Sequence, residues 1–267
     1  MPAHVWQRVN IALAERINMS ITIKSEKEIT LMREAGKILA EVHRLLEKEV
    51  VPGVSTWEID RKAAEFIRGF GCKASFLGYN GYPASICISV NDVVIHGIPS
   101  KDRILKEGDI VSLDAGVIYK GYQSDAARTV PCGKISAEAE RLIRVTRESF
   151  YEGLKYARGG NHLYEISGAV EDHVVAAGYS VVREFVGHGI GREMHEDPQI
   201  PHYHMKRRGI KLIPGMTICV EPMVNAGRCD INCLDDGWTI VTQDHSLSAH
   251  YENTILITEG EPELLSI

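Results

Sequence analysis

Residues 109–130 read DIVSLDAGVIYKGYQSDAARTV, and this stretch decides which fold the chain can adopt. Two apolar runs flank the turn Lys120-Gly121, a pattern typical of an antiparallel β-hairpin. If the turn is centred just before Lys120, Asp114 lies directly opposite Asp125. Two facing carboxylates on apolar strands repel each other, and burying them unpaired is costly. The hairpin therefore predicts a bound cation, with a salt bridge to a basic side chain as the alternative.

Three further candidate ligands lie in the second half of the chain. Glu221 ends the apolar run TICVEP, and Glu252 lies in the β-type run HYENTILI. The sequence GHGIG places His188 on a backbone with few side chains, which lets ligands approach closely, although a lone histidine is more often structural. Four carboxylates, one or two imidazoles and no thiolate suit Mn(II), Fe(II), Co(II) or Zn(II) rather than a closed structural zinc site. Four acids exceed the needs of one ion, so two bridged ions are expected.

The two halves of the chain repeat each other at an offset of 107 residues, with chance matching of common residues as the alternative. This predicts one compact domain over residues 25–267, with half-repeats at about 25–131 and 136–260, after an N-terminal extension over residues 1–24. Each half is expected to hold two helices and a sheet. The matched pairs are Gly53 and Gly160, Gly71 and Gly178, Leu105 and Leu212, Gly108 and Gly215, and Asp114 and Glu221.

Capping boxes and periodicity locate the expected elements. Ser25 and Ser55, each followed three residues later by glutamate, predict two helix starts. Further helices are expected over residues 137–157 and 164–177, and strands over 85–89, 93–95, 109–118 and 122–130. A short amphipathic helix over residues 1–18 is either a surface helix or the product of an upstream start codon before Met19.

Composition excludes several classes of function. The net charge of −6 favours neither nucleic acid nor anionic membrane as the main partner. No apolar run approaches the ~18 residues of a membrane span, and residues 1–18 lack the features of a secretory signal. The six cysteines are too sparse for a disulfide scaffold, and Cys229 and Cys233 have no second pair to complete a zinc site. Reduced thiols in the cytoplasm are expected.

The most specific motif is FVGHGIGREMHEDPQIPHY at residues 185–203. With this motif the chain resembles the type I methionine aminopeptidases over residues 28–258. The supporting segments are GYNGYP at 78–83, VVIHGIP at 93–99, SLDAG at 112–116, SDAAR at 124–128 and CVEPM at 219–223.

The resemblance implies the α+β pita-bread fold, a pseudo-twofold duplicated helix–helix–antiparallel sheet unit with helices packed outside a curved central sheet. It implies that two divalent ions (Co, Mn, Fe or Zn) are bridged by Asp125 and Glu252, with Asp114, His188 and Glu221 as the other ligands. His96 and His195 match positions that contact the substrate. The implied methionine pocket is formed by Tyr79, Tyr82, Cys87 and Trp238, with Phe76 and Met194 where relatives often carry cysteine and phenylalanine.

The implied activity is removal of the initiator methionine from nascent polypeptides, including those still at the ribosome, with a small second residue preferred. A water activated by the two metals attacks the peptide, Glu221 carries its proton to the leaving amine, His195 stabilises the oxyanion, and His96 orients the peptide. A cytoplasmic monomer without nucleic acid or membrane contacts is expected. His250 replaces a more usual glutamine, either as a partner of the ligands or as a tolerated variant.

Two rival functions share the implied fold. An X-Pro aminopeptidase or prolidase uses a similar ligand set, but usually carries a sizeable domain before the catalytic half. A non-catalytic binding protein of this fold predicts lost ligands and a basic surface, whereas all five ligands are present here and the charge is −6. The type II methionine aminopeptidases carry a long insertion, for which the spacing between His188 and Glu252 leaves no room.

Overall fold

The first two long helices begin at the capping boxes that the sequence predicts. In a computed structural model, which describes residues 21–267, Ser25 and Ser55 each donate from backbone and hydroxyl to the glutamate three residues later. The helix expected over residues 1–18 lies outside the described part of the chain. The helices are α2 (Glu26–Glu47), α3 (Thr56–Gly69), α4 (Ala137–Leu154), α5 (Leu163–Ala176) and the short 3-10 turn η1 (Tyr79–Gly81).

Within residues 21–267 the strands form an eleven-stranded antiparallel sheet and a separate three-stranded sheet, β11-β12-β3. The main path runs β1-β4-β5-β13-β9-β7-β8, with β2, β6, β10 and β14 attached at its sides. The strands are β1 (Lys73–Ala74), β2 (Cys87–Val90), β3 (Val93–Ile95), β4 (Ile110–Tyr119), β5 (Tyr122–Pro131), β6 (Ser180–Val181), β7 (Gly187–Gly189), β8 (Glu196–Ile200), β9 (Thr217–Val220), β10 (Met223–Asn225), β11 (Ile231–Cys233), β12 (Ile240–Thr242), β13 (Ser248–Leu256) and β14 (Glu263–Leu264).

The duplication is visible in backbone geometry. Helices α3 and α5 begin and end at the same offset of 107 residues. Gly53 and Gly160 have φ values of 92° and 93°, and their N–H groups donate to Leu105 and Leu212 respectively. The second half even has its own capping box, in which Glu165 replaces Glu58. These matches identify two copies of one unit, joined where β5 pairs with β13.

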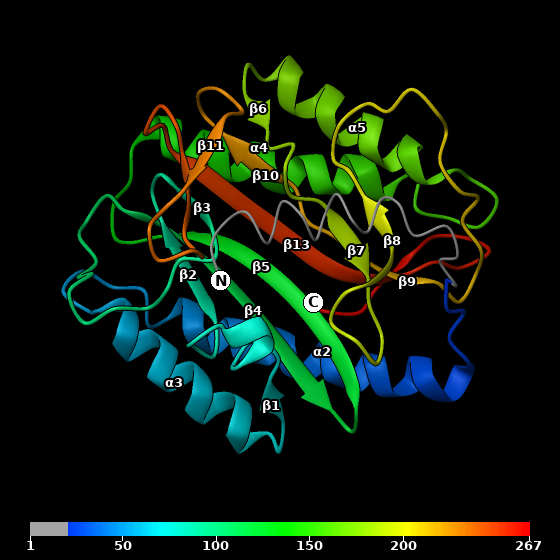
Figure 1. The fold of residues 1–267 in the computed structure, drawn as a ribbon, viewed down its shortest axis with the longest axis horizontal. Helices are drawn as coiled ribbons and strands as arrows, with labels where there is room; N and C mark the ends of the chain where they lie inside the picture. Colours follow the sequence, from blue (N-terminus) through cyan, green and yellow to red (C-terminus); the bar gives the residue numbers. More distant parts are fainter. Residues whose placement is uncertain (1–20) are drawn as a thin grey trace.

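The helices cover one side of the sheet and leave the other side available for a site. Helix α2 packs on β4 and β5, and α4 packs on β13, so each half of the sheet has its own helical cover. In Figure 1 both helices lie behind these strands. Each half also has its own apolar core beneath these helices, one around Leu39, Ile59 and Leu113 and the other around Phe150 and Ile218.

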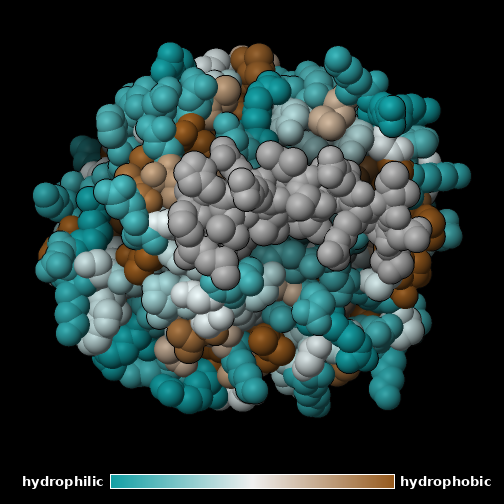
Figure 2. All heavy atoms as spheres, in the orientation of Figure 1, coloured by the Kyte–Doolittle hydropathy of each residue, from teal (hydrophilic) through white to brown (hydrophobic). Residues whose placement is uncertain are grey.

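The surface of the molecule is mainly polar. Figure 2 shows hydrophilic side chains over most of the visible face outside the grey atoms, with apolar side chains in scattered groups. No helix in the described part of the chain has the length and apolar character needed to cross a membrane. All six cysteines fall in this part, and each is a free thiol, as expected.

The hairpin of β4 and β5 differs from the predicted pairing by two residues. Asp114 faces Ala127, and Asp125 faces Gly116, so the two carboxylates are not directly opposite as predicted. The cause is the turn, in which Lys120 and Gly121 both have positive φ values (47° and 84°). These angles make both residues the central pair of a type I′ turn, which moves the centre of the hairpin one residue along the chain. Asp114 and Asp125 remain diagonal neighbours on the same face.

Candidate metal centre and substrate cavity

Twelve of the thirteen residues that the sequence marks as site candidates line one cavity of about 430 Å³. Met194 is the exception, because it is fully buried in the apolar cluster beside the cavity, with Phe76 and Tyr82. The other lining residues include Asn80, Phe185, Glu196, Asp197 and Gln199, none of which was selected from the sequence. A cavity of this size suits a small peptide end.

Strand register places the four acids together on the floor of the cavity. Asp114 on β4 faces Ala127 on β5, and Ala127 in turn faces Glu252 on β13. Glu221 directly follows Val220, the last residue of β9, and Val220 pairs with Asn253, the residue after Glu252 on β13. Asp125 is two residues from Ala127 and therefore shares its face. Carboxylates from both halves of the duplication thus meet where β5 and β13 pair.

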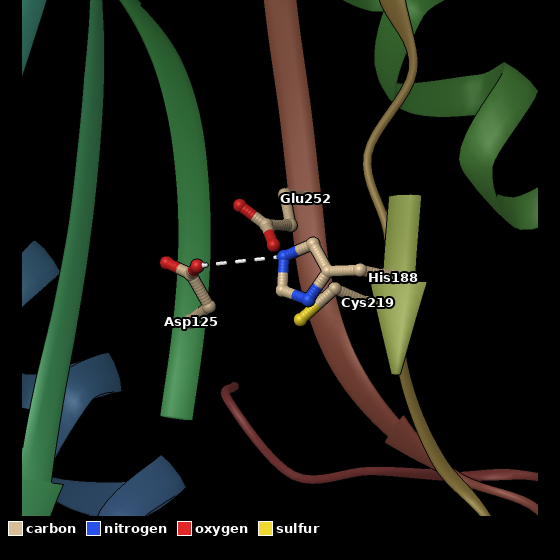
Figure 3. Close-up of side chains that lie close together, drawn as sticks. All are labelled: Asp125, His188, Cys219 and Glu252. Atoms are coloured by element: carbon tan, nitrogen blue, oxygen red, sulfur yellow. Dashed lines mark ion pairs between the residues drawn. The ribbon is translucent and has the colours of Figure 1, made fainter. Parts of the chain in front are cut away.

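His188 on β7 points a deprotonated nitrogen at these acids. Its Nδ1 lies 2.8 Å from the carbonyl oxygen of Gly189, which can only accept, so Nδ1 carries the hydrogen. The other nitrogen, Nε2, lies 3.5 Å from Glu221 Oε1. It also lies 3.9 Å from Asp125 Oδ2, the contact drawn as a dashed line in Figure 3. Burial lowers the pKa of His188 well below its usual value, so the ring is neutral. This tautomer and charge are what a metal ligand requires.

The glycines beside His188 serve the packing of strands. A Cβ on Gly187 would lie 2.3 Å from the carbonyl oxygen of Cys219, and one on Gly189 would lie 2.1 Å from that of Asp197. Only glycine allows β9 and β8 to approach β7 this closely on both sides. The sequence suggests that these glycines clear space for ligands, whereas the structure shows that the neighbouring backbones fill it.

Cys219 is a member of the cluster that the sequence analysis missed. One ligand atom each from Asp125, His188, Glu252 and Cys219 lie within 4.8 Å of one another (Figure 3). Burial raises the pKa of Cys219 well above its usual value, so the group beside the acids is a thiol and the expected ligand set without a thiolate stays a prediction. Cys219 precedes Glu221 by two residues in a predicted strand, so side-chain alternation was the signal that places both on one face.

The electrostatics of the cluster fit a divalent cation. Burial raises the pKa of Asp114 to about 7, and burial followed by repulsion from neighbouring carboxylates raises the pKa values of Asp125, Glu221 and Glu252 well above the usual range. Buried oxygens of Asp114 and Glu252 have no hydrogen-bond partner in the described part of the chain. Buried acceptors normally find a partner, so these oxygens are suited to a cation that would bind both.

His195 stands at the edge of the cluster with a hydroxyl behind it. Its Nδ1 lies 2.7 Å from the Tyr79 hydroxyl, and its ring centroid lies 4.3 Å from that of His188. Burial lowers the pKa of His195 to about 4, so the ring is neutral at pH 7. When Tyr79 donates to Nδ1, the hydrogen of His195 is on Nε2, where it can be donated to a substrate.

Aromatic rings form another part of the cavity lining. His96 has a positive φ of 59°, a conformation that costs energy for a non-glycine residue and that often occurs at functional sites. Its ring meets Phe185 edge-on at 5.6 Å. Tyr82 meets Trp238 in the same manner at 5.1 Å. With Phe76 these rings offer an apolar lining that suits a thioether side chain.

His202 is a second residue that the sequence analysis did not single out. Its ring is fully buried, and its Nε2 accepts a hydrogen bond of 3.0 Å from the backbone N–H of Glu221. Because Nε2 accepts, the ring hydrogen is on Nδ1. The imidazole therefore fixes the backbone at Glu221. It stands in the 185–203 motif, but nothing in the local pattern distinguishes it from a core histidine.

Comparison with known proteins gives consistent similarities. The model of metallopeptidase family M24 matches residues 30–259. The chain is 53% identical over 247 residues to a methionine aminopeptidase of Clostridium acetobutylicum, covering 92% of this chain and 99% of the relative. It is 47% identical over 250 residues to that of Escherichia coli K12, covering 93% and 95%.

Solved structures agree with the sequence relatives. A methionine aminopeptidase of Thermotoga maritima superposes with a TM-score of 0.91 at 43% identity, covering 92% of this chain and 99% of that one. An Xaa-Pro dipeptidase of Bacillus anthracis superposes less well, with a TM-score of 0.74 at 26% identity, covering 91% of this chain and 61% of that one.

Proposed function

The chain belongs to metallopeptidase family M24, among its methionine aminopeptidases, and we propose that it hydrolyses the first peptide bond of new proteins to release the initiator methionine. Its architecture is the α+β pita-bread fold expected from the sequence. The observation that carries the proposal is the cluster of four carboxylates and one imidazole on the floor of an aromatic-lined cavity. Metal-binding acids beside an apolar pocket suit a hydrolase that selects an apolar side chain at a chain end.

We further propose that two divalent ions bind in the cluster. The candidate ligands are Asp114, Asp125, His188, Glu221 and Glu252, and their buried, mutually repelling carboxylates support this assignment. The oxygen-rich set suits Co(II), Mn(II), Fe(II) or Zn(II). Bound there, the ions would supply Lewis-acid polarisation of the peptide carbonyl and lower the pKa of a water molecule.

The remaining steps belong to side chains of the protein. Glu221 lies beside His188 and is placed to carry the proton of the attacking water to the leaving amine. His195 donates from Nε2 to the carbonyl oxygen as it becomes negative. His96, held by its strained backbone and by Phe185, orients the peptide beyond the scissile bond. The apolar wall around Tyr82 and Trp238 excludes water and accepts the methionine side chain.

Cleavage specificity tests the proposal against the nearest rival. We expect the purified protein with added Mn(II) or Co(II) to hydrolyse Met-Ala-Ser at least about 100-fold more efficiently than Ala-Pro-Ala, measured as kcat/KM. The likeness to a methionine aminopeptidase (TM-score 0.91, 43% identity) exceeds that to the Xaa-Pro dipeptidase (TM-score 0.74, 26% identity), which favours this outcome. Preferential hydrolysis of Ala-Pro-Ala would instead support an X-Pro peptidase.

Asp114→Asn tests the ligand assignment directly. We expect the amount of bound metal per chain to fall. The metal affinity of the remaining sites should drop by at least ~10–100-fold, the usual cost of losing a residue that only supports a ligand. Metal analysis after dialysis, together with titration calorimetry of Mn(II), measures both quantities. The exposed Glu65→Gln on α3 is the control and should bind metal as the parent does. Unchanged occupancy in Asp114→Asn would remove this residue from the ligand set.

The setting of the reaction is also a proposal. Initiator methionines emerge on nascent chains, so the protein would act on those N-termini in the cytoplasm, including at the ribosome. Bacterial methionine aminopeptidases of similar sequence support this setting. A monomer is the oligomeric state proposed for the working protein.

A further inference from the structure

A buried ion pair joins the segment before α2 to the loop that carries His195. Lys24 Nζ lies 2.5 Å from Glu196 Oε2, and the two side chains are only 6% and 14% exposed. The Thr22 hydroxyl donates to the same carboxylate oxygen at 2.7 Å. A buried ion pair is weak evidence for stability, because desolvation offsets much of the attraction. This ion pair joins two segments that are 172 residues apart in the sequence. Its role is therefore sought in the position of the loop rather than in stability.

The loop is built around the lysine. A Cβ on Gly191 would lie 2.5 Å from both Lys24 Cε and Glu196 Oε1, so the two side chains occupy the space that this glycine leaves open. The backbone of Lys24 is itself held by a 2.8 Å hydrogen bond from its N–H to the carbonyl oxygen of Gly215. In Figure 1 this segment leaves the right-hand end of α2 in blue. Lys24 is therefore anchored through both backbone and side chain.

The carboxylate of Glu196 is held at both oxygens. Oε2 receives Lys24 and Thr22, while Oε1 accepts a 3.2 Å hydrogen bond from the backbone N–H of Glu193. Burial would raise the pKa of Glu196, but the hydrogen bonds from Lys24 and Thr22 outweigh it and the pKa is lowered. Glu196 therefore stays ionised at neutral pH and closes the turn that begins at Glu193.

His195 lies inside this closed turn, directly before Glu196 at the start of β8. Within residues 21–267 the Tyr79 hydroxyl is the one hydrogen-bond partner of its ring, so the position of its donor nitrogen depends on where the backbone holds it. Catalytic groups must be held closely, and a displacement of about 1 Å can cost about 10²-fold in rate. Lys24 does not line the cavity, and it supplies that restraint from outside through Glu196, which does.

We propose that Lys24, acting through Glu196, is a positioning residue that holds His195 in its donating orientation. The inference rests on the proposed function, since it assigns no activity of its own. It extends the site to a residue that precedes α2 and forms hydrogen bonds with none of the proposed metal ligands. The segment of residues 22–24 thereby becomes part of the working enzyme.

Lys24→Met removes the charge while keeping a long side chain. We expect kcat for Met-Ala-Ser to fall about 10–100-fold, with KM within about twofold and metal content unchanged, because the lost restraint matters in the transition state. Lys24→Arg, which retains the charge, should recover most of the loss. Thr22→Val removes two hydrogen bonds, one donated to Glu196 and one accepted from Lys24, but no charge. It should therefore give a smaller fall in kcat, and it stays informative if Lys24→Met does not fold.

Arg33→Met is the matched control. Arg33 forms an ion pair with Glu263 through two hydrogen bonds, between α2 and β14, and neither residue bonds to the His195 loop. Its loss should lower the melting temperature and leave kcat unchanged. If kcat falls equally in Lys24→Met and Arg33→Met, the effect is general destabilisation and the proposal is wrong.

A double-mutant cycle with His195→Ala separates positioning from structural damage. When His195 is absent, Lys24→Met should cause almost no further loss of kcat, because the two changes act on one group. Independent, multiplicative losses would overturn the proposal. Retention of full kcat by Lys24→Met in an enzyme whose parent cleaves Met-Ala-Ser would do so as well, whereas an inactive parent would contradict the proposed function instead.

Discussion

Replacing His195 with alanine is expected to lower kcat for Met-Ala-Ser by about 10²–10³-fold, the usual cost of removing one oxyanion donor. The physical reason is that the neutral ring, backed by Tyr79, offers a hydrogen at the edge of the carboxylate cluster. A neutral donor needs no reorganisation when negative charge develops on the substrate oxygen. Steady-state kinetics on the metal-loaded protein measures this loss, and metal content should remain that of the parent.

Two control variants sharpen this result. Tyr79→Phe removes the hydroxyl behind the ring and should cause a smaller fall in kcat, because the donor remains but its tautomer is no longer fixed. His204→Ala removes an exposed histidine that pairs with Asp172 on the surface, and kcat should not change. Full turnover in His195→Ala would exclude His195 from the mechanism.

The pH profile gives an independent check on His195. Because burial holds its pKa at about 4, the ring stays neutral from pH 5 upward. The acidic limb of kcat in the parent should therefore show no ionisation near pH 6.5 that disappears in His195→Ala. An ionisation near pH 6.5 that this substitution removes would mean that the ring is less shielded in the working enzyme than its burial indicates.

The pattern of residues along the strands predicted the face of the sheet on which each acid lies. It predicted the cross-strand partner of each acid less well. Alternation along a strand depends only on the local backbone, so Asp114 and Asp125 were assigned to one face despite the wrong register. Pairing depends on the turn, and one residue of error there moves every partner. The internal repeat was a stronger guide. Gly53 and Gly160, matched by the offset alone, have the same left-handed backbone conformation.

The residues that escaped prediction are those whose importance comes from distant contacts. His202 matters because its ring reaches the backbone N–H of Glu221, and Lys24 because it meets Glu196. Neither contact leaves a periodic or compositional mark in the sequence. The position of Cys219 could have been predicted, because it lies on the same strand face as Glu221. A cysteine in a buried apolar strand is also common without any function, so the residue was not selected.

Glu252→Gln is expected to abolish most activity and yet stabilise the metal-free protein at pH 8. The activity loss should reach about 10³-fold, because a metal ion contributes several kcal/mol to transition-state stabilisation. Burial, followed by the charges of Glu221 and Asp114, raises the pKa of Glu252 well above its usual value. An uncompensated buried charge costs about 3 kcal/mol, so its removal should raise the melting temperature by roughly 5–10 °C.

The sign of the pH dependence follows from the direction of these shifts. A carboxyl group whose pKa is higher in the folded than in the unfolded state binds more protons when folded, so its contribution to stability is present below about pH 4 and is lost as the pH rises through the folded value. For Asp114 that value is about 7. The metal-free parent should therefore become less stable from pH 5 to pH 8, and Glu252→Gln should lose less over the same window. Calorimetric melting of both proteins at each pH, with chelator present, measures the difference.

Metal addition provides the contrasting half of this experiment. Divalent ions bind the ionised carboxylates, so Mn(II) should raise the melting temperature of the parent more at pH 8 than at pH 5 and should release protons on binding. In Glu252→Gln the same addition should have little effect at either pH. If the variant instead melts below the metal-free parent at pH 8, the buried carboxylates do not repel one another as their burial implies. The folded protein would then stabilise the buried carboxylates without a cation. Their mutual repulsion would no longer support the assignment of these acids as metal ligands.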